Sequence, residues 1–597
     1  MKKLIFLMSF FVVIVLCANG VAPTHQWQWN YYYVPGMPDG LFDKAQRLDG
    51  TLTLPDKRVV KAQKFVYPRQ GKIDLYKVLK QRPKVLERTV VTSDFEVEKA
   101  QKVVLGLGVD WKCRLYCNGR KVFDSMICGN DATPPSNNDH YVQLDLKAGH
   151  NQLIWEVLGG RCEFWLCAQL KNIPTLEVLY QPWVMTPDSA ENAVSIVFAL
   201  NRPAPCGVDF RVKGEKQWKR IYNNLGGQIR RDLSVHSIRL TDLEPDKVYE
   251  YKIVVMDETR NFALLPQKIY TFRSAPAMDK KQFSFLASSD IQFPAPRRQA
   301  LLKKLFDFPE ARQCDFFAFI GDVDWNSDFN QTIVEEFVNY YCDAAGRDKP
   351  LVMVRGNHEY YGRDAGKYFD YFPAPEPGRE GYYMFRYGEV CFLVLDFGDD
   401  APGEAPPGTR FLNDLEPYFA AEAKWLRQAV KMDMFRTARY RIVLAHATPL
   451  GYGYGFMPGN VRKLIDPLFA GKTPEHRIHL WIGGHVHRPF RSVPGQNRCF
   501  WPLNKKYQPP VIKHPAIGEK YQFPVLIMGG PNSSMPENLQ FTNMLVNVNS
   551  NALEVIHRDV NNQVFDHISI TPDGKVQEIM RKDFFVERDY PGVAAGK

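Results

Sequence analysis

Between residues 283 and 487, five short apolar runs each end at a side chain that can bind a metal ion. The runs FSFLASS, DFFAFIG, PLVMVRG, RIVLA and HLWIGG are followed by Asp290, Asp322, Asn357, His446 and His485, with His487 two positions further on. Helical patterns separate the runs, and such alternation indicates an α/β fold with a buried sheet. Because the carboxyl ends of parallel strands share one edge of a sheet, we expect these six side chains to converge there.

Each of these residues alone has an ordinary structural explanation. An aspartate after a strand commonly caps a helix or starts a turn, and a preceding glycine suits a tight turn. The shared position at five strand ends, in this order, is what favours a metal site. Helices are predicted between the runs at residues 297–308, 330–344 and 418–432, where apolar residues recur at helical spacing.

The blocks DIQ, GDVDWN, GNHE, AH and GHVH resemble the signature of calcineurin-like metallophosphoesterases, a superfamily that includes the purple acid phosphatases. GNHE and GHVH are the specific parts of the match, and the resemblance covers about residues 280 to 550. It implies that residues 278–597 form a metallophosphoesterase domain, a four-layer α/β/β/α sandwich that ends in a β-hairpin.

The resemblance also implies two metal ions that share Asp322 as a bridging ligand, with His358 as the catalytic histidine beside them. The other expected ligands are Asp290, Gln292 and His487 for one ion, and Asn357, His446 and His485 for the second. Carboxylates, an amide oxygen and imidazoles suit iron, zinc or manganese. Two such ions lower the pKa of a bridging water, and the resulting hydroxide would attack phosphorus while His358 gives a proton to the leaving oxygen.

Gln292 and Trp325 depart from the usual family pattern. Histidine is commonest at the first position, and purple acid phosphatases instead bind the same ion through a tyrosine at the second, where the indole of Trp325 can only donate a hydrogen bond. The carbonyl oxygen of Gln292 is a neutral, hard donor, so we expect a weaker first site rather than an inactive enzyme. Without a metal-binding tyrosine, we expect the enzyme to be colourless.

Three side chains beside the ligand blocks are candidates for substrate contact, namely Arg355, Trp325 and Tyr360. A guanidinium matches phosphate oxygens bidentately, and an aromatic ring can stack on a flat or sugar leaving group. The structural alternatives are a surface salt bridge for Arg355 and packing beneath the loops for the rings. Pro/Gly-rich stretches at 398–411 and 494–520 are expected to be long loops that shape the site.

Short alternating runs before residue 278 predict two all-β sandwiches. Residues 23–172 resemble galactose-binding-like sandwiches and contain Asn118-Gly119, a dipeptide that favours a tight hairpin. Residues 173–277 resemble the fibronectin type III domain that precedes the catalytic domain in purple acid phosphatases. In this segment, Leu243, Pro245 and Tyr249 have the spacing of a corner in which the tyrosine hydroxyl bonds to nearby backbone.

Residues 1–22 have the pattern of a signal peptide, because two lysines precede an apolar run that is followed by small residues. No later segment reaches the roughly 18 apolar residues of a spanning helix. We therefore expect a mature chain without a transmembrane segment, exported to the periplasm, the cell surface or the medium; a lipid anchor at Cys17 is the alternative. Export also allows one or two disulfides within the first 210 residues.

Charge is spread along the chain, with 76 basic and 66 acidic residues and no dense basic block. Nucleic acid is therefore not an expected partner, whereas a mildly positive surface suits anionic substrates. Three functions remain open. The first is a secreted phosphomonoesterase acting on a phosphorylated small molecule, glycan or lipid. The second is a phosphodiesterase on lipid, nucleotide or glycan phosphodiesters. The third is a non-catalytic glycan-binding protein with a vestigial metal site.

Overall fold

The computed structural model describes residues 20–590 except 40, 43–46, 70, 131, 161–162, 257–261, 265–267, 329, 376–380, 399–413, 451–472 and 504–517. Most of the predicted signal peptide, with Cys17, and large parts of the two Pro/Gly-rich stretches lie outside these residues. Among the residues described, no helix is long and apolar enough to cross a membrane. The chain divides into two compact units, Met1–Glu177 with Val254–Leu265, and Val178–Ile253 with Pro266–Lys597.

The first unit contains two antiparallel sheets and one short helix, α1 (Leu75–Leu79). The six-stranded sheet has the order β4 (Gln63–Phe65), β1 (Gln28–Tyr32), β6 (Arg88–Val97), β11 (Gly149–Leu158), β8 (Lys112–Cys117), β9 (Arg120–Asp124). The four-stranded sheet has the order β10 (His140–Leu146), β7 (Gln101–Val109), β12 (Trp165–Lys171), β5 (Lys72–Asp74). A separate hairpin is formed by β2 (Thr51–Thr53) and β3 (Val59–Lys61).

Side chains from both sheets form the core of the first unit, as the alternating runs predict. Trp29 and Trp155 from the six-stranded sheet pack in one cluster with Leu105 and Leu144 from the four-stranded sheet. The predicted Asn118-Gly119 turn joins β8 to β9, and both residues have a positive φ, 49° and 83°. No disulfide is formed by the cysteines that the structure describes in this unit, at positions 113, 117, 128 and 167.

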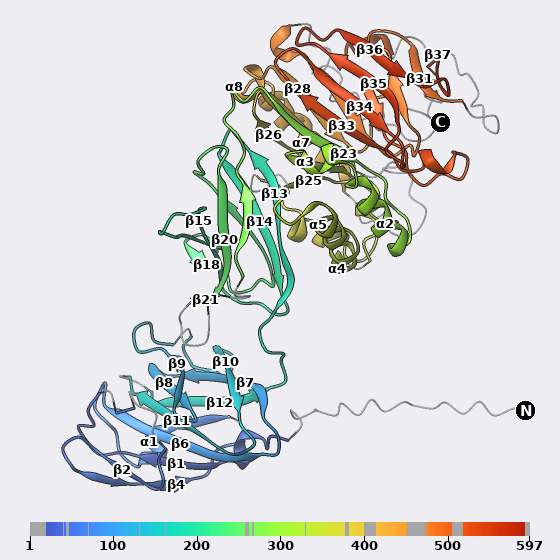
Figure 1. Ribbon diagram of the computed structural model, residues 1–597. Coiled ribbons are helices and arrows are strands. Elements are labelled where there is room, and N and C mark those ends of the chain that lie inside the picture. The colour runs from blue at the N-terminus through green and yellow to red at the C-terminus, as the bar shows by residue number, and fades with distance from the viewer. Residues whose placement is uncertain are drawn as a thin grey trace, which may run out of the picture. The chain divides into compact units, whose positions relative to one another are not determined.

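Two large sheets dominate the second unit (Figure 1). One has ten strands in the order β19 (Val235–Leu240), β14 (Ala193–Leu200), β13 (Val178–Asp188), β25 (Leu351–Val354), β24 (Phe316–Ile320), β23 (Phe283–Ser288), β33 (Asn543–Val548), β34 (Leu553–Arg558), β35 (Val564–Ile570), β36 (Val576–Arg581). The other has eight in the order β26 (Tyr383–Tyr387), β27 (Val390–Leu395), β28 (Tyr440–Ala445), β29 (Leu480–Gly483), β32 (Val525–Ile527), β30 (Phe490–Ser492), β31 (Arg498–Pro502), β37 (Phe585–Asp589).

The two large sheets share one apolar core. Alternate residues such as Phe285 and Phe316 from the ten-stranded sheet, and Phe392 and Ile442 from the eight-stranded sheet, belong to a single cluster. The central strands are apolar along their whole length because their other faces are covered as well. Phe317 and Phe319 of β24, for example, pack instead with residues of the helices that follow.

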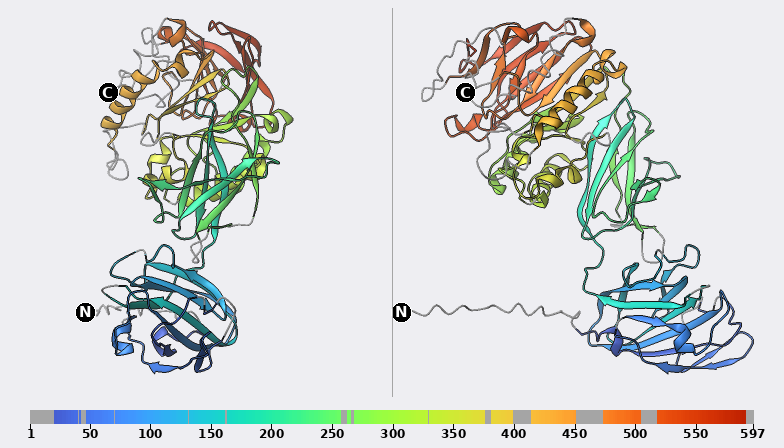
Figure 2. Two further views of the ribbon diagram at one scale, coloured as in Figure 1. Left: turned by 90° about the vertical axis from the view of Figure 1, so that its left-hand side faces the viewer. Right: turned by 180° about the vertical axis from the view of Figure 1, so that it is seen from behind.

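Helices cover the outer faces of both sheets (Figures 1 and 2). Those associated with the ten-stranded sheet are α2 (Ala295–Leu305), α3 (Pro309–Gln313), and α4 (Asn330–Ile333) with α5 (Asn339–Ala345), which one π-helical turn joins. Leu426 of α7 (Leu415–Ala429) packs in one cluster with β27 and β28 of the eight-stranded sheet. Short helices α6 (Tyr368–Tyr371) and α8 (Asp433–Arg436) complete the set. All three predicted helices are present.

The β-strands between residues 178 and 273 belong to three different sheets. β13, β14 and β19 extend the ten-stranded sheet, because β13 pairs in parallel with β25. A five-stranded sheet is formed by β15 (Cys206–Val212), β16 (Lys219–Tyr222), β20 (Val248–Met256), β21 (Phe262–Leu264) and β22 (Tyr270–Arg273), and β17 (Asn224–Leu225) pairs with β18 (Gln228–Ile229). The predicted corner is present, since the Glu244 N–H donates to the hydroxyl of buried Tyr249 at 2.8 Å.

A multidomain chain with amino-terminal β-structure and a later α/β part is therefore confirmed. The four-layer description and the galactose-binding-like and fibronectin type III assignments stay predictions, as do the predicted domain boundaries.

Candidate metal centre

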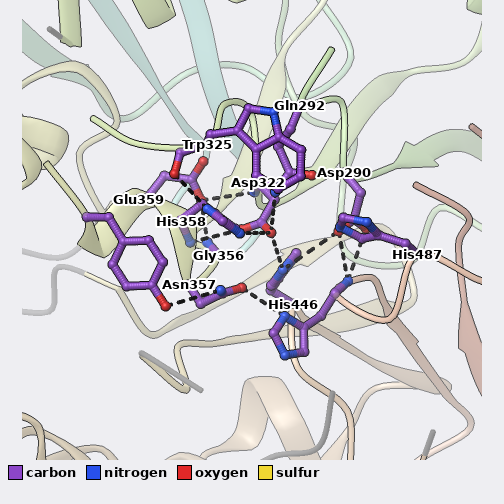
Figure 3. A network of polar contacts seen from close by, with 12 residues as sticks. Asp290, Gln292, Asp322, Trp325, Gly356, Asn357, His358, Glu359, His446 and His487 are labelled. Atoms are coloured by element: carbon purple, nitrogen blue, oxygen red, sulfur yellow. Dashed lines mark hydrogen bonds and ion pairs between the residues drawn. The ribbon is translucent and has the colours of Figure 1, made fainter. Parts of the chain in front are cut away.

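The six side chains singled out at strand ends come together in the second unit (Figure 3). β23, β24 and β25 are parallel neighbours in the ten-stranded sheet, and β28 and β29 are parallel neighbours in the eight-stranded sheet. The candidate ligands therefore follow the carboxyl ends of these strands. Because the two sheets share a core, these ends lie close to one another, and their side chains meet.

Two groups of side chains have the donor types and spacing of metal sites, and both include Asp322. One consists of Asp322, His446 and His485, and the other of Asp290, Asp322 and His487, with the ligand atoms of each group within 4.8 Å of one another. The Asn357 Oδ1 lies 2.8 Å from the His485 Nδ1 and so joins the first group. This is the arrangement that two ions sharing one carboxylate require.

The imidazole rings are held so that chosen nitrogens face the carboxylates. The Nδ1–H of His446 donates to the Ile320 carbonyl at 2.6 Å, and that of His487 donates to the Pro531 carbonyl at 2.8 Å. Each ring therefore directs its Nε2 toward the cluster, 3.1 Å from Asp322 Oδ2 and from Asp290 Oδ1 respectively. Backbone partners of this kind fix the tautomer and orientation of metal-binding histidines.

Two buried polar atoms in the cluster have no hydrogen-bond partner, His446 Nε2 and Gln292 Oε1. An unsatisfied buried polar atom costs about 1–3 kcal/mol, so such atoms require an explanation. His446 Nε2 lies 3.1 Å from Asp322 Oδ2, so a metal cation bound there would take the place of a proton between the two groups. The chemistry of the donor set fits a metal ion.

Gln292 lies inside the cluster, and its Nε2 donates to Asp322 Oδ2 at 2.7 Å. Its Oε1 is the unpaired atom. A half-turn of the amide exchanges its oxygen and nitrogen and would place the oxygen inside the cluster, where it could bind a cation. Coordination by Gln292 stays a prediction, and the residue is in the right place for it.

Four of the ligands occupy the left-handed region of backbone conformation, which non-glycine residues rarely adopt. The φ values are 54° for Asp290, 63° for Asp322, 72° for His485 and 56° for His487. Such conformations cost about 1–3 kcal/mol each and persist where the surrounding structure imposes them, often at functional sites.

Glycines let the ligand loops approach closely. A Cβ on Gly356 would lie 2.2 Å from Asp322 Oδ1, and one on Gly484 would lie 2.2 Å from Asp290 Oδ2. A Cβ on Gly530 would lie 2.5 Å from that of Asp290. The glycines that precede Asn357 and His485 are therefore required by space around the carboxylates, in addition to any role in turning the chain.

Burial opposes charge on each of these groups, but their mutual interactions overcome it in part. Burial would raise the pKa of Asp322, yet the imidazoles of His446, His358 and His485 bring it below its ordinary value. Burial would lower the pKa of His446, but Asp322 and Asp290 raise it to about 10. The pKa of His485 falls to about 4 through burial and the charge of His446. Because a metal requires a neutral imidazole, binding at His446 is expected to release a proton.

Glu359 holds the two ligand loops together, and its role was not predicted from the sequence. Its buried carboxylate accepts hydrogen bonds from the backbone N–H groups of Asp322, Val323 and Gly356, at 2.9, 2.8 and 2.7 Å. It thereby ties the loop after β24 to the loop after β25. The GNHE block offered a clue to this role. Glu359 follows Asn357 and His358 directly, so its carboxylate is close enough to bond to the backbone of the site.

We expect Glu359→Gln to lower the free energy of unfolding by about 2–4 kcal/mol, because an amide cannot accept from all three N–H groups and loses the charge. Metal affinity should fall about 10–100-fold, as for other changes behind the ligands. Chemical denaturation and metal titration of the two proteins measure both effects. Glu416→Gln, an exposed position on α7, is the control. Equal stability of all three proteins would show that Glu359 does not hold the two loops together.

His358 lies beside the carboxylate that the two groups share, with its Nε2 3.8 Å from Asp322 Oδ2. Its backbone N–H donates to Asp322 Oδ1 at 3.1 Å, and its Nδ1–H donates to the Trp325 carbonyl at 2.7 Å. The indole of Trp325 is 51% exposed and stands edge-on to the imidazole, with ring centres 5.3 Å apart. The predicted catalytic histidine therefore faces the cluster, and Trp325 forms a half-exposed wall beside it (Figure 3).

Arg355 and Tyr360 are placed elsewhere. Both are largely buried, and the guanidinium lies over the Tyr360 ring at 3.4 Å. The Tyr360 hydroxyl donates to Asp396 at 2.9 Å, and an Arg355 nitrogen lies 3.9 Å from the same carboxylate. Asp396 follows β27 and also accepts from Tyr418 at 3.0 Å. Among the residues that the structure describes, Arg355 and Tyr360 thus form a buried unit with Asp396, and the contacts found for them do not include the two groups of candidate ligands.

Comparison with known proteins gives one family match. Residues 283–489 match the calcineurin-like phosphoesterase domain. A search of curated proteins found no match. Among solved structures, the chain is similar to purple acid phosphatase PPD1 from yellow lupin (Lupinus luteus), with 15% identity and a TM-score of 0.46 over 81% of this chain and 93% of that one. It is also similar to PhoD, with 14% identity and a TM-score of 0.44 over 68% and 92% of the two chains.

The domain match and the paired ligand groups define a metallophosphoesterase, a hydrolase of phosphoric esters with a dinuclear metal site. The match of residues 283–489 to the calcineurin-like phosphoesterase model confirms the resemblance noted in the sequence.

Proposed function

We propose that this protein is a secreted phosphomonoesterase with two metal ions, and that its substrate is a phosphorylated small molecule, glycan or lipid. The sharing of Asp322 by two ligand groups, with His358 at 3.8 Å from it, is the observation that supports this proposal. The carboxylates of Asp290 and Asp322 are buried, whereas the indole of Trp325 beside His358 is 51% exposed, so Trp325 is the member of this site available to a leaving group at the surface.

The ions would be held by the two groups of ligands, with Gln292 as an additional oxygen donor to the group of Asp290 and His487. When bound, they would polarise the phosphoryl oxygens and lower the pKa of a water molecule. We propose iron, zinc or manganese, since carboxylate and imidazole donors suit ions of intermediate hardness. Gln292 makes the first group richer in oxygen, which favours manganese relative to zinc there.

The protein's own residues position the ester and supply a proton. His358 keeps its Nδ1–H on the Trp325 carbonyl, so Nε2 is the nitrogen directed at the cluster. When protonated there, Nε2 can donate to the oxygen of the leaving alcohol as the ester bond breaks. The hydrogen bond from the His358 backbone N–H to Asp322 fixes the distance between the proton donor and the bridging carboxylate.

Trp325 would contact the leaving group. Its ring lies 5.3 Å from that of His358 and 6.5 Å from that of His487, so it is adjacent both to the proton donor and to a metal ligand. An exposed indole offers a flat apolar surface on which a sugar or aromatic leaving group can stack. Of the three substrate contacts suggested by the sequence, this is the one that we retain in the proposal.

The test compares hydrolysis of p-nitrophenyl phosphate and bis-p-nitrophenyl phosphate by the metal-loaded protein. A phosphomonoesterase is expected to have a higher kcat/KM for the monoester. A preference for the diester would identify a phosphodiesterase. Background turnover of both compounds, equal to that of a variant without the bridging carboxylate, would leave only a binding function.

Loading with iron should leave the protein colourless, because Trp325 replaces the metal-binding tyrosine and an indole cannot form a phenolate. Absorption spectra of the iron-loaded protein, with metal content measured in parallel, test this expectation. Trp325→Tyr is the matched comparison, since it supplies a phenol at the same position. A visible charge-transfer band in the native protein would show that another tyrosine binds the ion.

Export is proposed from residues 1–22. Expression in the native host followed by amino-terminal sequencing of the mature protein tests it, with a new terminus near residue 23 expected. A lipid-modified Cys17 at the terminus would instead support anchoring. An intact first methionine in the cytoplasmic fraction would overturn both.

A further inference from the structure

A second polar pocket lies in the first unit, remote in sequence from every metal ligand. Its volume is about 480 Å³, within the range of small-molecule sites in proteins. The outer face of the six-stranded sheet forms its floor, and residues 47–51 together with the end of β3 form its rim.

Strand register places the polar floor residues on one face. Gln28 of β1 is directly opposite Asp94 of β6, and Asp94 is opposite Gln152 of β11. In the next row, Asn30 is opposite Lys64 of β4. Directly opposed residues in antiparallel strands point to the same side of the sheet. Gln28, Asn30, Lys64 and Asp94 all line the pocket.

The other end of this sheet face is apolar and covered. Tyr32, Val90 and Ile154 pack there against Leu52 and Val60 of the β2–β3 hairpin. The hairpin therefore covers the apolar rows and stops short of the polar ones. The polar end of the face is left open as the pocket.

Hydrogen bonds fix the floor and the rim relative to one another. Asp94 accepts from Gln152 at 2.9 Å, and its Oδ1 lies 3.1 Å from the His150 Nε2. The same Gln152 side chain donates to the Leu48 carbonyl and accepts from the Leu48 N–H, both at 2.9 Å. The rim is thereby tied to the floor before any ligand arrives, which reduces the entropy cost of binding.

Four polar side chains in the pocket have unused hydrogen-bonding capacity. Among the residues that the structure describes, the amides of Gln28 and Asn30 and the ammonium groups of Lys61 and Lys64 have no side-chain hydrogen bond or ion pair. Arg47 lies 3.4 Å from Asp49, and Asp94 lies 3.1 Å from the His150 Nε2. Because Arg47, Lys61 and Lys64 outnumber Asp49 and Asp94, the lining keeps a net positive charge.

This chemistry selects a class of ligand. Amides donate to and accept from neighbouring hydroxyl groups, a carboxylate accepts from them, and two lysines attract an anionic substituent. The one aromatic residue of the lining, Tyr32, is 1% exposed and offers no stacking surface for a nucleobase. A simple inorganic anion would leave the amides unused and would be repelled by Asp94 and Asp49. We propose that this pocket binds an acidic saccharide, whose hydroxyl groups contact Gln28, Asn30 and Asp94 and whose carboxylate or sulfate contacts Lys61 and Lys64.

Isothermal titration calorimetry of the full mature protein tests the proposal with three probes: tetragalacturonate, a sulfated tetrasaccharide, and the neutral maltotetraose. We expect saturable binding of one acidic probe, at least tenfold tighter than that of maltotetraose. Which acidic probe binds more tightly distinguishes carboxylate from sulfate recognition. Equal binding of acidic and neutral probes, or no saturable binding of any probe, would overturn the proposal.

Variants locate the binding. Lys61→Ala with Lys64→Ala should weaken binding of the acidic probe at least tenfold, and Asn30→Ala should weaken it while keeping the charge. The matched control is Lys99→Ala with Lys102→Ala, which removes the same charge from exposed positions of this unit outside the pocket. Circular dichroism and thermal unfolding, compared with those of the native protein, show that each variant keeps the first unit folded. The same loss in the control pair would show that binding is general charge attraction. No loss in the pocket variants would show that the saccharide binds elsewhere.

Discussion

Replacing Asp322 by asparagine is expected to lower kcat at least about 10³-fold, which would be the largest effect of any single change in this protein. Asp322 is the one residue common to both ligand groups, and it is almost completely buried. The amide has nearly the same size but no charge, so it cannot neutralise two cations at once. Loss of the bridge should also lower the metal content.

Steady-state hydrolysis of p-nitrophenyl phosphate and elemental analysis measure these two effects. Asp343→Asn, an exposed position on α5, changes the same charge away from the site and should behave as the native protein. Circular dichroism establishes that the Asp322 variant is folded. Retention of two ions and of more than a tenth of the native kcat would show that Asp322 is not a bridging ligand.

Replacing His358 by alanine should lower kcat about 10²–10⁴-fold for a phosphate ester with a poor leaving group. The reason is specific to proton transfer, because Nε2 faces the cluster while Nδ1 is occupied by the Trp325 carbonyl. An alkyl phosphate needs a proton on its leaving oxygen, whereas p-nitrophenolate leaves readily without one. The loss should therefore be much smaller for p-nitrophenyl phosphate.

The measurement is a series of esters whose leaving groups differ in pKa. Native protein should show a shallow dependence of kcat on leaving-group pKa, and the alanine variant a steep one. Metal content should stay at the native value, because His358 is outside both ligand groups. His476→Ala, at a partly exposed position, is the control. An equal loss for every ester would assign His358 a role in binding or structure instead.

The convergence of the ligands could be predicted because it follows from topology. Asp290, Asp322 and Asn357 each follow a buried strand, and the three strands are parallel neighbours. Residues that follow parallel neighbouring strands lie along the same edge of the sheet. The histidines arrive in the same way from the other sheet. Their final contacts also depend on the left-handed backbone at Asp290 and Asp322, for which the sequence contains no specific signal.

Residues near a ligand block in sequence need not be near the metals in space. Arg355 and Tyr360 flank the GNHE block, but their side chains pack with Asp396, which lies after a strand of the other sheet. Glu359 shows the opposite case, since it contacts backbone groups that belong to two loops. Both outcomes depend on contacts between segments far apart in the chain, which periodicity and local motifs do not encode.

The parallel pairing of β13 with β25 has a practical consequence for anyone who wishes to isolate the catalytic part of this chain. A fragment that begins at residue 278 would lack three strands of the ten-stranded sheet and would present the unpaired backbone of β25 to solvent. Exposed edges of apolar strands recruit other chains and lead to aggregation. A recombinant fragment that begins just before Val178 keeps this edge covered and is the better choice for expression.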